Sequence, residues 1–140
     1  MKILVIDAQG GGLGRQLVTA IKKEIGDAIV TAVGTNATAT ATMLKAGADY
    51  AATGENAVIV ACRQADVIVG PVGVVIADSL FGEVTPAMAA AIGASAARRI
   101  LIPFNQCDNY IVGIPDLSMG RLVEEAVSMI RAADQDKPLV

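Results

Sequence analysis

Histidine and tryptophan are absent from this chain of 140 residues, and only two cysteines are present. The absence of histidine excludes His-based catalytic triads and zinc sites that use His ligands. Cys62 and Cys107 form neither a disulfide framework nor a metal-ligand spacing, so we expect no metal site. Aromatic residues make up only 3% of the chain, so alanine, valine and isoleucine must form the core. A core of such small side chains is typical of parallel α/β folds.

Positive charge is also scarce. Lys and Arg total 11 against 14 Asp and Glu, and the pI is about 4.8. The basic residues form no cluster larger than a pair, which argues against a nucleic-acid partner. No apolar run is long enough to span a membrane, and the start of the chain lacks the pattern of a signal peptide, so we expect a cytoplasmic protein. Hydrophobic residues nevertheless reach 54%, which suggests a homo-oligomer that buries part of its apolar surface.

The length predicts one domain over residues 1–140, with residues 134–140 as a frayed tail. Short apolar runs predict strands that alternate with amphipathic helices, and this alternation implies a parallel sheet. Residues 110–114 are predicted as an additional edge strand. The expected strands are 2–6, 28–33, 49–52, 66–70 and 99–104, and the expected helices are 13–25, 37–45, 55–65, 86–97 and 118–133. The fold class is therefore α/β, a Rossmann-like three-layer sandwich with a mostly parallel sheet of five or six strands.

Residues 37–45 carry conflicting signals. Thr and Ala alternate there with a period of two, which favours a strand. A parallel sheet, however, needs a crossover connection at this point, and Asn36 is a suitable helix cap. We predict a helix from Ala37 to Lys45 and keep the strand as the alternative.

Glycines gather between the first predicted strand and the first predicted helix, from Gly10 to Gly14. Strand, glycine loop and helix form the context of a loop that binds nucleotide phosphates, because glycine permits close approach and the helix offers free N–H groups. The alternative is a tight turn that binds nothing. The residues predicted to bind a cofactor here are Asp7, Gln9, Gly10, Gly11, Gly12, Leu13, Gly14 and Arg15.

The first half of the chain resembles the cofactor-binding half of short-chain dehydrogenases. Ala8, Gly12 and Gly14 occupy the glycine positions of that family's G-x-x-x-G-x-G loop, and residues 66–73 resemble its fourth strand. The resemblance implies that Gly70, Pro71 and Gly73 lie at the cofactor. Neither Tyr50 nor Tyr110 has a lysine four residues later, so the family's catalytic Tyr-x-x-x-Lys pair is absent.

Polar residues follow the predicted strands at their carboxyl ends, where open α/β sheets bind ligands. Thr35 and Asn36 follow the second strand, at the place where dinucleotide-binding folds carry an acidic residue for the ribose. Since neither is acidic, NADP is slightly favoured over NAD, and an ATP-type nucleotide is the alternative. Asn105, which follows the last strand, is a further candidate for cofactor contact.

Four residues are candidates for catalysis, each with a plain structural alternative. Asp7 would act as a base or hold a ribose or Mg²⁺, or else it accepts hydrogen bonds from the loop. Glu55 would transfer protons or cap a helix. Asp78 would transfer protons from a loop that forms a lid over the site, or it would only be a solvated residue of that loop. Cys107 would be a reactive thiol, although no histidine exists to activate it.

The whole chain also resembles a family of short bacterial proteins that share a domain of unknown function. The resemblance implies a stand-alone cytoplasmic domain and no established activity. Its segments are Val5–Gly12, Gly34–Ala37, Met43–Ala48, Ala52–Ala57, Val69–Gly73 and Ile102–Cys107. The sequence thus predicts a protein that binds a nucleotide or dinucleotide, with a homo-oligomeric ligand sensor or regulatory subunit as the alternative, and a protein that binds no ligand as a third hypothesis.

Overall fold

A computed structural model of the chain describes residues 1–104 and 108–136. Its sheet has five strands, all parallel, in the order β3-β2-β1-β4-β5. The strands are β1 (Lys2–Asp7), β2 (Ile29–Gly34), β3 (Tyr50–Thr53), β4 (Val67–Pro71) and β5 (Arg98–Ile102). The α/β class and the parallel sheet are confirmed, and the number of strands among the described residues is five.

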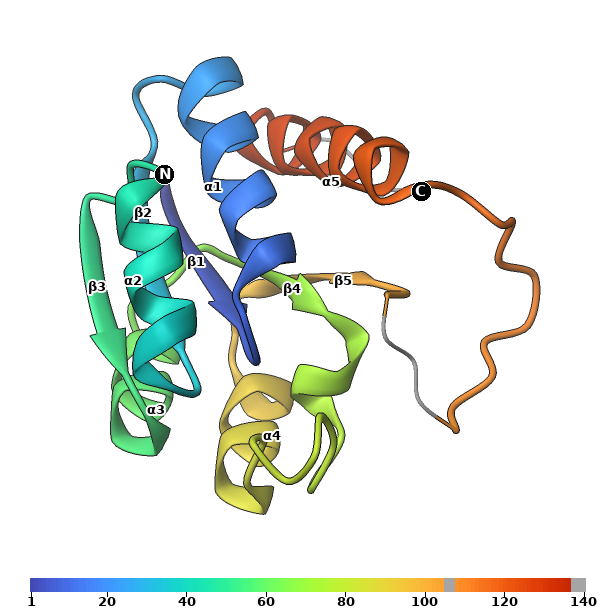
Figure 1. Ribbon diagram of the computed structural model, residues 1–140. Coiled ribbons are helices and arrows are strands. Elements are labelled where there is room, and N and C mark those ends of the chain that lie inside the picture. Colours follow the sequence, from blue (N-terminus) through green and yellow to red (C-terminus); the bar gives the residue numbers. More distant parts are fainter. Residues whose placement is uncertain (105–107, 137–140) are drawn as a thin grey trace.

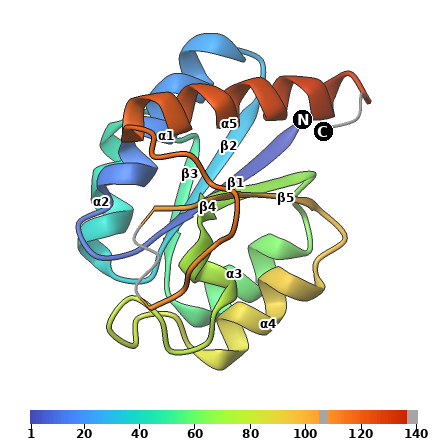
Figure 2. The ribbon, with the colours of Figure 1, turned by 90° about the vertical axis from the view of Figure 1, so that its right-hand side faces the viewer.

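The helices lie on both faces of the sheet and complete a three-layer sandwich (Figures 1 and 2). One face is covered by α1 (Gly12–Glu24), α2 (Ala37–Lys45) and α5 (Met119–Asp134), whose buried residues form one apolar cluster. The other face is covered by α3 (Glu55–Cys62), the short 3₁₀ helix η1 (Val72–Val75) and α4 (Pro86–Ala94), which form a second cluster. Aliphatic side chains and alanine dominate both clusters, as the composition predicted.

Residues 37–45 are helical, so the crossover argument is correct and the period-two pattern is misleading. Asn36 caps α2 through its side-chain oxygen, which accepts a hydrogen bond from Ala39 N at 2.9 Å. Ala39 and Met43, four residues apart, are both fully buried on the same side of the helix. The four-residue spacing of these two buried side chains fits a helix, whereas the alternation of Thr and Ala does not correspond to the pattern of burial.

The predicted edge strand over residues 110–114 is wrong. The segment turns at Val112 and Gly113, where Gly113 has a φ of +81°, and it forms no ladder with β5. Tyr110 and Val112 are 90% and 98% exposed. Their apolar side chains therefore do not reflect burial in a sheet. In Figure 2 the segment crosses in front of the end of β5 as an extended connection to α5.

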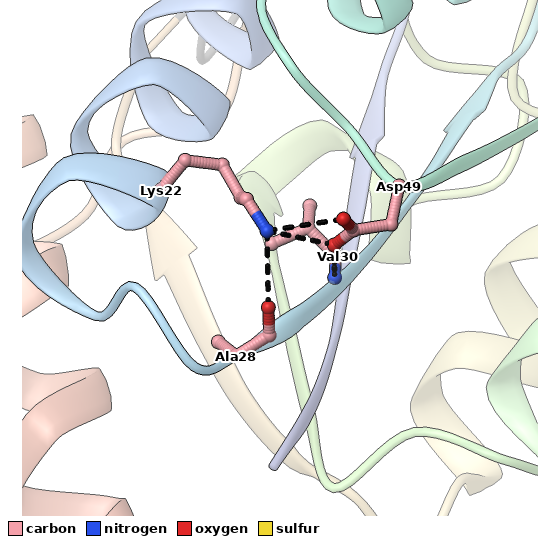
Figure 3. A network of polar contacts seen from close by, with 4 residues as sticks. All are labelled: Lys22, Ala28, Val30 and Asp49. Atoms are coloured by element: carbon pink, nitrogen blue, oxygen red, sulfur yellow. Dashed lines mark hydrogen bonds and ion pairs between the residues drawn. The ribbon is translucent and has the colours of Figure 1, made fainter.

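A polar cluster at the amino ends of β2 and β3 fastens the edge of the sheet to α1 (Figure 3). Lys22 Nζ lies 2.9 Å from Asp49 Oδ2 and 3.2 Å from the carbonyl oxygen of Ala28. Asp49 Oδ2 also accepts a hydrogen bond from Val30 N at 2.8 Å. That bond, followed by the contact with Lys22, lowers the pKa of Asp49. The glycine loop lies at the other end of the strands, so this cluster serves the fold.

Candidate functional site

Asp7 is the last residue of β1, and its side chain organises the glycine loop. It is 6% exposed. Its two carboxylate oxygens accept hydrogen bonds from Ala8 N at 2.8 Å and from Gly14 N at 2.7 Å. The loop closes further through Gly11 N, which donates to the carbonyl of Ala8 at 3.0 Å. These contacts correspond to the structural alternative for Asp7, in which the carboxylate holds the loop.

Burial raises the pKa of Asp7, because it takes the carboxylate out of water. The hydrogen bonds from Gly14 and Ala8 act in the opposite direction, and the charge of Glu83 adds a small further increase. The folded protein therefore binds the Asp7 proton more tightly than the unfolded chain does. By linkage, this contribution to stability is fully present below the ordinary value of 3.8 and is lost as the pH rises through the raised pKa.

We accordingly expect the stability difference between the wild type and an Asp7→Asn variant to depend on pH. The asparagine side chain does not titrate in this range. The difference in unfolding free energy therefore favours the wild type most below pH 3.8 and shrinks as the pH rises. Urea denaturation of both proteins at intervals from about pH 3 to pH 8 measures it. A difference that stays constant over this range would contradict the raised pKa.

A cavity of about 210 Å³ lies over the loop, between the carboxyl ends of β1 and β4. Its lining combines residues of the glycine loop with apolar residues from other parts of the chain. This volume is below the roughly 300–1,000 Å³ of typical small-molecule pockets, so it would enclose only part of a dinucleotide. Its lining residues are Asp7, Ala8, Gln9, Gly10, Gly11, Gly12, Leu13, Pro71, Leu80, Phe104 and Met119.

Three backbone N–H groups at this cavity are free among the described residues: those of Gly10, Gly12 and Leu13. Gly12 and Leu13 are the first two residues of α1, where a helix offers unpaired donors and the positive end of its dipole. A Cβ atom placed on Gly10 or on Gly12 would meet nothing within 4 Å. The loop is therefore open on the side where an anion would bind.

The other two loop glycines are required by packing. Gly11 has a φ of +76°, and a Cβ there would lie 2.9 Å from Cα of Ala39. A Cβ on Gly14 would lie 2.5 Å from Met43 Sδ and 2.9 Å from Asp7 Cβ. Both positions bring α1 and the loop against α2. The four glycines thus divide into two that face the cavity and two that join the elements around it.

Glu83 adjoins the glycine loop without lining the cavity, and the sequence analysis did not single it out. Its Oε1 atom accepts three hydrogen bonds: from Gln9 N at 2.9 Å, from Thr35 Oγ1 at 2.8 Å and from Asn36 Nδ2 at 2.6 Å. Partial burial would raise the pKa of Glu83, but the three hydrogen bonds outweigh it and lower the pKa. Glu83 therefore remains a carboxylate at neutral pH and joins the glycine loop to the end of β2.

The remaining predicted binding residues differ in whether they line the cavity or only adjoin it. Asn36 Nδ2 also donates to the carbonyl of Gln9 at 3.0 Å, so Thr35 and Asn36 adjoin the loop through Gln9 and Glu83. Arg15 is exposed and makes no ion pair with any described residue. Pro71 lines the cavity. Gly70 lies against the Ile6 carbonyl and Gly73 against Ser79 and Leu80, so these two serve packing.

Of the described candidates for catalysis, Asp7 lines the cavity and Glu55 and Asp78 do not. The Glu55 carboxylate accepts a hydrogen bond from Thr85 Oγ1 at 2.6 Å, which ties the start of α3 to the cap of α4. Asp78 is exposed and closes its own loop through Asp78 N and the Val84 carbonyl, 2.8 Å apart. Neither residue lines the cavity. Cys107 and Asn105 lie outside the described residues, and Cys62 is buried in the core.

Larger hollows exist elsewhere on the surface. One of about 270 Å³ lies at the amino ends of the strands, against Lys2, Ile29 and Tyr50. We prefer the cavity at the glycine loop, because parallel α/β sheets bind ligands at the carboxyl ends of their strands. No group of three or more Cys, Asp or Glu side chains in residues 1–104 and 108–136 is placed to hold a metal ion. Within the same ranges, no helix combines the length and apolarity that a membrane crossing requires.

The parallel sheet, its covering helices and the glycine loop between β1 and α1 define a Rossmann-like α/β protein. The chain belongs to the family described as Domain of unknown function (DUF3842), whose model matches residues 2–135. This finding confirms the family resemblance drawn from the sequence. No curated protein matches the chain. Among solved structures, the chain is similar to a dodecameric FMN-dependent UbiX-like decarboxylase from Escherichia coli O157:H7, with 17% identity, a TM-score of 0.43, and coverage of 97% of this chain and 94% of that chain.

Proposed function

We propose that this protein binds a phosphate-bearing nucleotide at the glycine loop, with a nicotinamide dinucleotide, NAD or NADP, favoured over an ATP-type nucleotide. The observation that carries the proposal is the set of free N–H groups on Gly10, Gly12 and Leu13, which border a cavity at the carboxyl edge of the sheet. Oriented N–H groups at a helix start bind phosphate oxygens. Exposed Arg15 follows one residue after the loop and supplies a cation for the same phosphate.

The rest of the cavity suits the ring of such a ligand. Pro71, Leu80, Phe104 and Met119 are its apolar lining residues from outside the loop. Ligand sites commonly combine an apolar wall with a few fixed polar groups. The candidate carboxylates are occupied differently, since Asp7 holds the loop and Glu55 holds the cap of α4. The described residues thus favour ligand binding over acid–base catalysis.

The test is a thermal shift of the purified protein against NAD, NADP, FAD, ATP, GTP, coenzyme A and S-adenosylmethionine, with and without Mg²⁺. A ligand at about 100 times its dissociation constant adds roughly 2.7 kcal/mol of stability. At about 2–4 °C per kcal/mol, the expected rise in Tm is roughly 5–10 °C. A panel with no shift, from protein shown to carry no bound nucleotide, would contradict the proposal.

A second candidate function, a homo-oligomeric ligand sensor, is favoured by exposed apolar side chains. Phe81 is 95% exposed in the loop after η1, and Tyr110 and Val112 are equally exposed in the segment after β5. Contiguous exposed apolar patches mark interaction surfaces, and these three side chains would contribute apolar area to such a patch. Sedimentation velocity with and without NAD distinguishes a ligand-dependent assembly from a monomer of 14.3 kDa in both conditions, which would contradict this candidate.

A further inference from the structure

We propose that Glu83 selects the ribose of the bound nucleotide: it accepts a hydrogen bond from a free 2′-hydroxyl and rejects a 2′-phosphate. The inference rests on the proposed function and narrows it to ligands of the NAD type. It reverses the slight preference for NADP drawn from the sequence, because Glu83 adds an acidic group to the neutral pair Thr35 and Asn36.

The position of Glu83 is the first argument. Dinucleotide-binding folds carry an acidic residue at the end of the second strand, where it binds the ribose hydroxyls. Thr35 and Asn36 follow β2 in this chain and are neutral. Glu83 brings a carboxylate to that place from another part of the chain, 48 and 47 residues further along, by hydrogen bonds of 2.8 and 2.6 Å. The acidic group is thus present in space although it is absent from the local sequence.

The second argument is that the two carboxylate oxygens of Glu83 differ in their hydrogen bonds. Gln9, Thr35 and Asn36 all donate to Oε1. Oε2 accepts no hydrogen bond from any residue that the structure describes. Oε1 therefore fixes the orientation of the side chain, and Oε2 is left as an acceptor for a ligand hydroxyl.

The third argument is charge. No Lys or Arg pairs with Glu83 in the described part of the chain. Its three partners are neutral groups, so its negative charge is not compensated. The donors of Thr35 and Asn36 that would have received a 2′-phosphate are already used by Oε1. A 2′-phosphate beside Oε2 would meet a like charge, and like-charge contacts discriminate strongly between ligands.

The loop that carries Glu83 is built to hold it in place. Asp78 N donates to the Val84 carbonyl at 2.8 Å, and Val84 N donates to the Ser79 carbonyl at 3.3 Å, which closes the loop on itself. Asp78, Leu80 and Phe81 all have positive φ angles, between 55° and 63°, which non-glycine residues rarely adopt. Leu80 is buried against the cavity. The closed backbone and the anchored Leu80 direct Glu83 towards Gln9.

The experiment is a calorimetric titration of NAD and NADP into the wild type, into Glu83→Gln and into Glu125→Gln. Glutamine keeps an oxygen for the three donors but removes the charge, so the variant tests charge while preserving the contact. Glu125→Gln removes the same charge from an exposed site on α5 and is the matched control. We expect the wild type to bind NAD about 10- to 100-fold more tightly than NADP. In Glu83→Gln that ratio should approach one, mainly because NADP binds more tightly, and in Glu125→Gln it should not change.

The outcomes separate this inference from the proposed function. Equal affinity of the wild type for NAD and NADP would leave the proposed function standing and overturn the role of Glu83. A ratio in Glu83→Gln equal to that of the wild type would do the same. If neither dinucleotide binds the wild type, the nicotinamide proposal and this inference fail together.

Discussion

A Gly12→Val variant is expected to lose nucleotide binding while it keeps its fold. Gly12 begins α1 and lines the cavity, and a Cβ placed on it meets nothing within 4 Å. The valine side chain would therefore enter the space that the phosphate needs, without pressing on the protein. Displacing the phosphate removes charge-assisted hydrogen bonds worth about 1.5–3 kcal/mol each. The loss of two of them weakens binding about 100-fold or more, which titration calorimetry measures directly.

Gly120→Val is the matched control for that experiment. Gly120 lies in the first turn of α5, is exposed, and also has open space around its Cβ position. It carries the same change in helix propensity and is not among the residues that line the cavity. Gly120→Val should bind nucleotide like the wild type, and both variants should have wild-type circular dichroism. Undiminished binding by Gly12→Val would show that the phosphate lies elsewhere.

Gly70→Ala, which adds a single methyl group, is expected to lower the free energy of unfolding strongly. Gly70 lies in β4, buried beside β1 at the centre of the sheet, and an added Cβ would collide with the carbonyl oxygen of Ile6. Backbone of a central strand cannot yield as a flexible side chain can. Overpacking of a core costs about 1–3 kcal/mol, and the involvement of two paired strands places this variant at about 3 kcal/mol or more. Urea denaturation gives the value from the shift in midpoint.

Gly93→Ala provides the comparison for Gly70→Ala. It is the same substitution in the last turn of α4, where a Cβ meets nothing within 4 Å. Alanine is favoured over glycine in a helix, so this variant should be stabilised by about 0.5–1 kcal/mol. Opposite signs for the two variants are the expected result. A Gly70→Ala protein as stable as the wild type would mean that β1 and β4 are not as closely paired as described.

Local sequence signals were sufficient for most of the fold. Residues 2–6 and 66–70 predict buried strands, because each range contains a short aliphatic run that ends at Asp7 or Gly70, and the observed strands are Lys2–Asp7 and Val67–Pro71. Thr85 and Pro86 predict the start of α4, and Thr85 does accept a hydrogen bond from Met88 N at 3.1 Å. Ser118 caps α5 at the predicted start of the helix, and its side chain accepts a hydrogen bond from Arg121 N at 3.3 Å. In each case the signal and the structure lie within a few residues of one another.

The candidate site could be predicted only in part, because its decisive contact is not local. Gln9 and Glu83 are 74 residues apart, and no pattern in the loop 78–84 indicates that its glutamate reaches the end of β2. Asp7 illustrates the converse problem. Its position predicted a role at the loop, but only the distances to Ala8 N and Gly14 N assign both oxygens to the backbone. Residues 110–114 were mistaken for a strand because apolar side chains usually indicate burial, and these are exposed.

The central place of β1 in the sheet has a consequence for the order in which the chain folds during synthesis. One edge of β1 pairs with β2, but the other pairs with β4, which follows about 60 residues later. At about 5–20 residues per second, the ribosome needs roughly 3–12 s to make the intervening chain. For that time the edge of an aliphatic strand, Ile3–Ile6, has no native partner. Unpaired strand edges promote aggregation, so the nascent chain is most exposed to misassociation before β4 emerges.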